Sequence, residues 1–264
     1  MLVKIQQIRN ATLRISYAGQ TFLVDPWFAP KGSMGTFRQI GLFKVFSDAE
    51  ADAPMPATEL PMSVEETLKG VDAYVVTHVH PDHVDIAPDG TVGALLDKSV
   101  PAFVQSDDDK AVLERSGFTF VSVLSDESSF KGVRLVKTPG RHGVIYPCGP
   151  SCGVVFQNPD EKTLYLAGDT VWFSGVEETL ARFKPDVIVL NSCAAHLVHE
   201  GRLIMDDEEA CRVKNTCPDA TVILSHMDVV AHATITRARM RQLMELRGVM
   251  GDFIMPEDGE TLEL

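Results

Sequence analysis

The sequence predicts an α/β fold in which stacked β-sheets carry helices on their outer faces. Two observations predict it: strand-like segments cluster at the start of the chain, and short apolar runs then alternate with amphipathic helical patterns. The chain has 264 residues, of which 45% are hydrophobic, so it can bury a sizeable core. No fixed-length repeat or interdomain linker interrupts the pattern, so we expect a single domain over residues 1–264.

The individual elements follow from local periodicity. At the start of the chain we expect strands at 3–9, 12–17 and 21–25. Ala18-Gly19-Gln20 separates the last two and is typical of an antiparallel hairpin. Short apolar runs predict buried strands at 74–76, 133–136, 164–166, 187–190 and 222–224. Amphipathic patterns predict helices at 107–115, 175–183, 206–214 and 234–246. Thr234 is the expected N-cap of the last helix, which should end at Gly248.

A long connection over residues 26–61 interrupts the alternation of predicted strands and helices, because it is rich in proline and glycine. It also carries too many apolar residues to remain solvated: Met34, Phe37, Ile40, Leu42, Phe43, Val45 and Phe46. Three interpretations stay open, namely a lid over a substrate, a contact in a homo-oligomer, and a loop packed on its own domain.

Charge and hydropathy exclude several classes of protein. The net charge is -13, so the overall field repels long nucleic acids and anionic membrane surfaces. The first 20 residues hold no hydrophobic region of a signal peptide, and no stretch reaches the roughly 18 apolar residues of a spanning helix. We therefore expect a cytoplasmic protein that does not bind membranes.

The five cysteines are an odd number and do not form a disulfide pattern, so we expect reduced thiols. Cys148 and Cys152 lie four residues apart and could bind a metal or form a redox pair. The alternative, two small apolar residues in a turn, is favoured because no second cysteine pair lies at zinc-ribbon spacing.

The strongest local signal is the segment Thr77-His-Val-His-Pro-Asp-His83, which follows an apolar run. In an extended backbone, His78 and His80 project to the same side and can bind one ion. Pro81 suits the first position of a helix, which would turn Asp82 and His83 toward a second ion. Clustered imidazoles next to a carboxylate cost desolvation without packing gain, so metal binding explains them better than chance surface placement does.

Further ligands are expected at the ends of other strands. His142 follows the run at 133–137, Asp169 follows 164–168, and His226 follows 222–225. The ordered set H-x-H-x-D-H, His142, Asp169 and His226 resembles the metallo-β-lactamase superfamily. Segments 10–27, 164–170 and 221–228 are most similar to the branch that includes L-ascorbate-6-phosphate lactonase. The resemblance covers nearly the whole chain and implies an αββα four-layer sandwich of two mixed β-sheets flanked by helices.

The resemblance also implies a site for two divalent ions. Its ligands would be His78, His80 and His142 for one ion, and Asp82, His83 and His226 for the other, with Asp169 as the bridge. Imidazole and carboxylate ligands suit zinc first, then manganese or iron. Two such ions with the two carboxylates and a bridging hydroxide carry about one net positive charge, which favours a small anionic substrate.

Catalysis would then require Asp82 to orient the hydroxide and Asp169 to hold both ions. The expected reaction is hydrolysis of an ester, lactone or phosphoester, with lactonase activity favoured. Phosphodiesterase or nuclease activity is one alternative. The other is an iron-containing redox module without hydrolysis.

Five residues around the site have weaker assignments. Asp25 either fixes the tautomer of a ligating imidazole or starts a turn before Pro26. Arg141 either binds a phosphate or carboxylate of the substrate or is a solvated charge. Asn191 and His232 are candidate substrate contacts. Asp228 is either a partner of a metal ligand or a structural residue.

Overall fold

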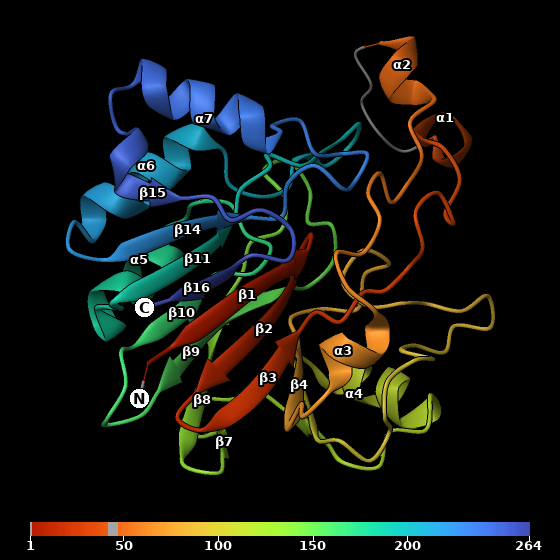
Figure 1. Cartoon of the computed structure of the whole chain (residues 1–264), viewed down its shortest axis with the longest axis vertical. Coiled ribbons are helices and arrows are strands. Elements are labelled where there is room, and N and C mark those ends of the chain that lie inside the picture. The colour runs from red at the N-terminus through yellow and green to blue at the C-terminus, as the bar shows by residue number, and fades with distance from the viewer. Residues whose placement is uncertain (1, 42–46) are drawn as a thin grey trace.

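Two seven-stranded β-sheets face each other in the computed structural model, which describes residues 2–41 and 47–264 (Figure 1). The first sheet has the order β16-β1-β2-β3-β4-β5-β6. Its strands are β1 (Lys4–Arg9), β2 (Thr12–Tyr17), β3 (Gln20–Val24), β4 (Ala73–Val76), β5 (Ala102–Val104), β6 (Val121–Val123) and β16 (Thr261–Glu263).

The second sheet has the order β15-β14-β11-β10-β9-β8-β7. Its strands are β7 (Ser129–Phe130), β8 (Val133–Pro139), β9 (Cys152–Gln157), β10 (Leu164–Leu166), β11 (Val187–Asn191), β14 (Thr221–Ser225) and β15 (Phe253–Ile254). A short hairpin of β12 (His196–Leu197) and β13 (Gly201–Arg202) lies outside both sheets. The helices are α1 (Phe37–Ile40), α2 (Asp48–Ala51), α3 (Val64–Leu68), α4 (Asp107–Arg115), α5 (Ser174–Phe183), α6 (Asp207–Thr216), α7 (Arg237–Leu246) and the 3-10 helix η1 (Met250–Asp252).

Both sheets are mixed, as predicted. In the first, β1, β2 and β3 are antiparallel, whereas β3 through β6 run parallel. The predicted hairpin joins β2 to β3 through Ala18 and Gly19, whose φ angles of 48° and 75° fit a tight two-residue turn. In the second sheet, β10, β11, β14 and β15 run parallel, so their carboxyl ends lie at one edge.

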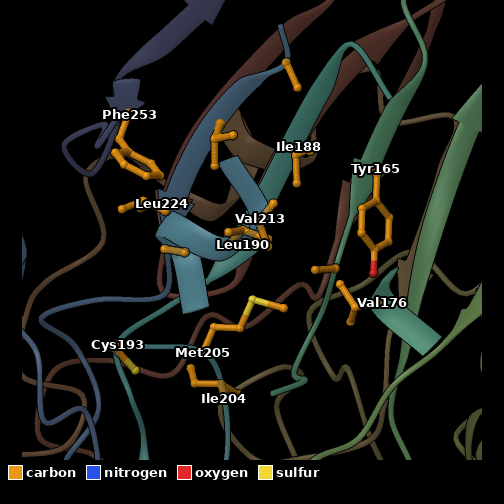
Figure 2. Packing of buried hydrophobic residues seen from close by; sticks show 14 of the residues in the cluster. Tyr165, Val176, Ile188, Leu190, Cys193, Ile204, Met205, Val213, Leu224 and Phe253 are labelled. Atoms are coloured by element: carbon orange, nitrogen blue, oxygen red, sulfur yellow. The ribbon is translucent and has the colours of Figure 1, made fainter. Parts of the chain in front are cut away.

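The core consists of three apolar layers, one between the two sheets and one on the outer face of each sheet, and alternating residues of a central strand contribute to different layers. On β11, Val187 and Val189 pack between the two sheets, whereas Ile188 and Leu190 pack on the outer face of the second sheet. Helices α5, α6 and α7 cover that outer face, and Figure 2 shows Val213 beside Leu190 and Val176 beside Tyr165. Strands buried on both faces read as continuous apolar runs, which is why the sequence revealed them.

The outer face of the first sheet is covered by α3 and α4. Leu23 and Tyr74 from the sheet share a core cluster with Leu113 of α4, and Val64 and Leu68 of α3 pack against it. Helices therefore lie outside both sheets, and the predicted αββα sandwich is confirmed.

Several element predictions need correction. Thr236, not Thr234, caps α7, because its side chain accepts a hydrogen bond from the backbone N of Arg239. The sequence did not predict eight of the described strands, since short runs at these positions show no clear period: β5, β6, β7, β9, β12, β13, β15 and β16. Cys152 lies buried in β9 and not in a turn. All five cysteines are free thiols, as expected.

The described part of segment 26–61 packs on the body of the protein through a base formed by Trp27, Phe37 and Met55, while α1 and α2 otherwise stand apart from the sheets (Figure 1). Trp27, Phe37 and Met55 are buried in one cluster with Val229 and Val230. The loop-packing interpretation is therefore correct for the base of the segment. The predicted apolar residues Leu42, Phe43, Val45 and Phe46 fall on 42–46, outside the described residues.

Every described helix is too short or too polar to cross a bilayer.

Candidate metal centre

The histidine-rich motif leaves β4 through a tight turn. The backbone N of His80 bonds the His78 carbonyl at 3.2 Å, and those of His83 and Val84 bond the His80 carbonyl, each at 3.0 Å. The predicted helix after Pro81 is wrong, because only one turn forms. After this turn, the carboxylate of Asp85 accepts a hydrogen bond from the backbone N of Phe28.

This turn brings the predicted ligand side chains together. The ring centroids of His78 and His80 lie 4.2 Å apart, and those of His78 and His83 lie 4.1 Å apart. Potential ligand atoms converge in three overlapping groups: His78, His80 and His142; His78, His83 and Asp169; and Asp82, His83 and His226. The two groups expected for separate ions are therefore both present. Asp169 belongs to the remaining group, which shares His78 with one of them and His83 with the other.

Asp169 lies at the centre of this cluster. Its Oδ2 is 3.3 Å from His83 Nε2, 3.7 Å from His142 Nε2 and 4.0 Å from His78 Nε2. Gly168 directs the chain here, because its φ is +65° and a Cβ would collide with the carbonyl oxygen of Cys152. One carboxylate among several imidazoles is the arrangement that a bridging ligand requires.

The residues fit a bound metal. Among the described residues, His78 Nε2 and Asp82 Oδ2 are buried and have no hydrogen-bond partner, although unpaired buried polar atoms are costly. Tetrahedral zinc ligands at 2.0–2.1 Å from the ion are about 3.3 Å apart. The Nε2 atoms of His226 and His83 are 3.2 Å apart.

A partner at Nδ1 orients four of the imidazoles so that Nε2 faces the centre. These partners are Asp25 Oδ2 for His83 (2.8 Å), Thr77 Oγ1 for His78 (3.1 Å), the Leu203 carbonyl for His142 (3.3 Å) and Cys193 Sγ for His226 (3.6 Å). Such outer partners are the usual device for fixing the tautomer of a ligating imidazole.

In the absence of an ion, the buried histidines and carboxylates of the cluster shift one another's pKa values. Burial by itself would lower the pKa of His83, but Asp169 and Asp25 outweigh burial and raise it well above the usual value. Burial would raise the pKa of Asp169, but His83 and His226 hold it well below its usual range. Burial lowers the pKa of His80 to about 4, so this imidazole is neutral and ready to bind a metal at neutral pH.

Asp25 forms the shortest of these four contacts to an imidazole Nδ1. Besides His83, its carboxylate accepts hydrogen bonds from the backbone N and the Oγ1 of Thr77, both at 2.7 Å. It thus links the end of β3 to the first residue after β4. This geometry supports its expected role as an imidazole partner and not only as a turn residue.

We expect Asp25→Asn to weaken metal binding by about 10- to 100-fold, because the neutral amide no longer stabilises the His83 tautomer. The measurement is the metal dissociation constant, obtained by competition with a chelating dye. Asp72→Asn is the matched control, since Asp72 also accepts a backbone N–H of a threonine, Thr21, but lies outside the cluster. Equal metal affinity in the two variants would contradict the role of Asp25.

The other tentative residues lie in different places. Asn191 donates from Nδ2 to Asp169 Oδ1 at 2.7 Å, so it holds the bridging candidate and is not directed at a substrate. His232 lines the pocket, with Nε2 3.6 Å from Asp82 Oδ2. Asp228 accepts hydrogen bonds from the backbone N and the guanidinium of Arg237, so it anchors the start of α7.

Arg141 is exposed and does not line the pocket, and its guanidinium contacts the Val144 carbonyl at 3.5 Å. Its backbone N bonds Thr170 Oγ1 instead. Cys148 does line the pocket, whereas Cys152 is buried in the core between the sheets. The two cysteines therefore have different environments.

Sequence reasoning missed several residues that support the cluster. Thr77 and Cys193 contact ligating imidazoles, and Asn10 Nδ2 donates to the Asp82 carbonyl at 3.0 Å. Thr77 could have been found by its place directly before His78. Asn10 and Cys193 carry no local signal, since only folding brings them to the site.

A small pocket of about 220 Å³ opens onto the cluster. Its lining combines ligand candidates with apolar side chains: Met34, Ile40, Met55, His80, Pro81, Asp82, His142, Cys148, Asp169, Leu197, Leu203 and His232. Among the described residues, the lining includes no lysine and no arginine.

Comparisons with known proteins agree with this fold. The family described as "Beta-lactamase superfamily domain" matches residues 20–227. The UPF0173 protein YddR of Bacillus subtilis is 37% identical over 263 residues, which are 98% of this chain and 99% of that protein.

Two solved structures are also similar over the whole chain. One is an isothiocyanate hydrolase from Delia radicum gut bacteria, with 37% identity, a TM-score of 0.86 and coverage of 99% of this chain and 98% of that one. The other is a possible metal-dependent hydrolase from Veillonella parvula, with 36% identity, a TM-score of 0.89 and full coverage of both chains. The chain therefore belongs to the metallo-β-lactamase superfamily of metal-dependent hydrolases.

Proposed function

We propose that this protein hydrolyses small, uncharged electrophiles with an apolar group, and that isothiocyanates are the first substrates to test. The observation that carries the proposal is the pocket beside the ligand cluster. Its volume of about 220 Å³ is below the roughly 300–1,000 Å³ of typical ligand sites, and its described lining offers no lysine or arginine to pair with a charged group of the substrate. The isothiocyanate hydrolase, at 37% identity, supports the same choice.

We further propose two divalent ions, zinc first and manganese or iron next, held as two ligand groups with Asp169 between them. When bound, such ions supply hydroxide at neutral pH and polarise the attacked group. The protein itself contributes orientation. Asp82 lies at the pocket wall to hold the attacking water, and His232 lies beside it, where it can hydrogen-bond the substrate.

The reaction consumes one water for each isothiocyanate. An O–C bond forms at the central carbon of R–N=C=S, and the nitrogen takes up a proton. The C–N bond of the resulting thiocarbamic acid then breaks as the remaining acid proton, the second one from the water, moves to the nitrogen, which gives a primary amine and carbonyl sulfide. No oxidant or reductant is needed, and the apolar R group stays in the pocket until the amine leaves.

Lactones and phosphoesters of anionic metabolites, the substrates expected from the sequence, have less support. Arg141, the residue expected to bind their charge, is not part of the described pocket lining. An uncharged lactone or ester remains compatible with the pocket, because it also presents an electrophilic carbon without a charge.

The test is a comparison of kcat/KM for a phenylalkyl isothiocyanate, an uncharged γ-lactone, a phosphorylated sugar lactone and a phosphodiester, using metal-loaded protein. We expect the isothiocyanate to exceed both anionic substrates by at least about 100-fold, since the described lining offers no lysine or arginine to pair with a phosphate group of the substrate. Chelator-treated protein is the control. Preference for either anionic substrate would overturn the proposal.

A further inference from the structure

The apolar part of the pocket lining comes from two separate segments of the chain. Met34, Ile40 and Met55 belong to segment 26–61, whereas Leu197 lies in β12 and Leu203 follows β13. Different parts of the core support them, because Met55 packs with Trp27 and Leu203 packs with the helices of the second sheet. The ligand candidates form the polar part of the same pocket.

Hydrogen bonds hold the first of these segments in place. The backbone N of Met34 bonds the Met55 carbonyl at 2.9 Å, so the two methionines are held side by side. The buried guanidinium of Arg9 donates to the Ala29 carbonyl at 2.7 Å and to the Thr58 carbonyl at 3.0 Å. Arg9 thus ties both ends of the segment to β1, so this side of the pocket exists before a substrate binds.

The second segment is connected directly to the ligand cluster. The backbone N of Leu203 bonds the Ala195 carbonyl at 2.7 Å, and the Leu203 carbonyl is the partner of His142 Nδ1. The side chain that lines the pocket and the carbonyl that orients a ligand candidate therefore belong to one residue. Leu203 therefore places an apolar side chain of the pocket next to the ligand candidate His142.

We propose that Met34, Met55 and Leu203 form a specificity subsite that binds the hydrocarbon group of the substrate. This inference rests on the proposed function and names its substrate class, namely isothiocyanates with aliphatic or arylalkyl groups small enough for the pocket. Methionine side chains are unbranched and adaptable, so the subsite accepts groups of different shape and selects mainly by length. Burial of one methylene favours binding by about fourfold.

The first measurement does not depend on turnover. Straight-chain alkyl hydroxamates chelate metal ions, and their dissociation constants for metal-loaded protein can be measured by calorimetry. We expect affinity to rise by about two- to fourfold per methylene until the pocket is full, and then to level off. In Met34→Ala we expect a fivefold to tenfold loss for the long chains and less than twofold for the shortest, because the shortest does not reach Met34.

Met62→Ala is the matched control, since Met62 is also partly exposed but does not line the pocket. It should leave the chain-length series unchanged. A flat series in the wild type, or an equal loss at every length in Met34→Ala, would overturn the subsite. The thermal midpoint of each variant separates these results from unfolding.

The same length series with alkyl isothiocyanates separates this inference from the proposed function. If hydroxamate affinity follows chain length but isothiocyanates are not hydrolysed, the subsite is supported and the assigned reaction fails. If isothiocyanates are hydrolysed with the same kcat/KM at every length, the reaction is supported and the subsite is overturned.

Discussion

Asp169→Asn is expected to remove most of the bound metal and to lower kcat/KM by about 10³-fold or more. The amide has nearly the same shape and still accepts the hydrogen bond from Asn191. It lacks the negative charge that lies within 4.0 Å of four imidazole nitrogens, those of His78, His83, His142 and His226. The loss should therefore come from metal binding and not from the fold.

Elemental analysis of purified protein measures this effect. We expect about two transition-metal ions per chain in the wild type and fewer than one in Asp169→Asn. Asp160→Asn, an exposed position outside the cluster, should retain both ions. Full metal content in Asp169→Asn would remove this residue from the ligand set, and a wild type without metal after reconstitution would contradict the site as a whole.

Phe156→Ala is expected to lower the free energy of unfolding by about 3–5 kcal/mol. Phe156 lies in β9 of the second sheet and is fully buried. Its ring packs edge-on against Phe22 and Tyr17 of the first sheet, with centroids 5.2 and 5.8 Å away. Truncation thus opens a cavity in the layer that joins the two sheets.

Chemical denaturation of metal-free protein measures this cost without the contribution of bound ions. Phe120→Ala removes the same atoms from a side chain that is 61% exposed, and should change stability by no more than about 0.5 kcal/mol. Similar values for the two variants would mean that Phe156 does not support the contact between the sheets.

Local pattern was sufficient for much of the fold. The central strands are buried on both faces, so their sequences are continuous apolar runs, as at 187–190 and 222–224. Helices α4, α5 and α6 repeat an apolar side every three or four residues, and their bounds were predicted within about two residues. Strands such as β9 were not predicted, since this strand begins with Cys152 and Gly153 and neither residue indicates a strand.

The sequence by itself determined stacked sheets with outer helices and ligand candidates at strand ends, because these apolar patterns are local. Its resemblance to the metallo-β-lactamase superfamily implied the αββα class. Tertiary structure alone decided where the remaining polar side chains point. Asn191 turns to Asp169, Asp228 to Arg237, and Arg141 to the surface, although all three were candidates for the site. It also decided that methionines from segment 26–61 meet Leu203 in the pocket. These contacts join residues far apart in the chain, so their geometry depends on how the two sheets and the loops pack and not on any local period.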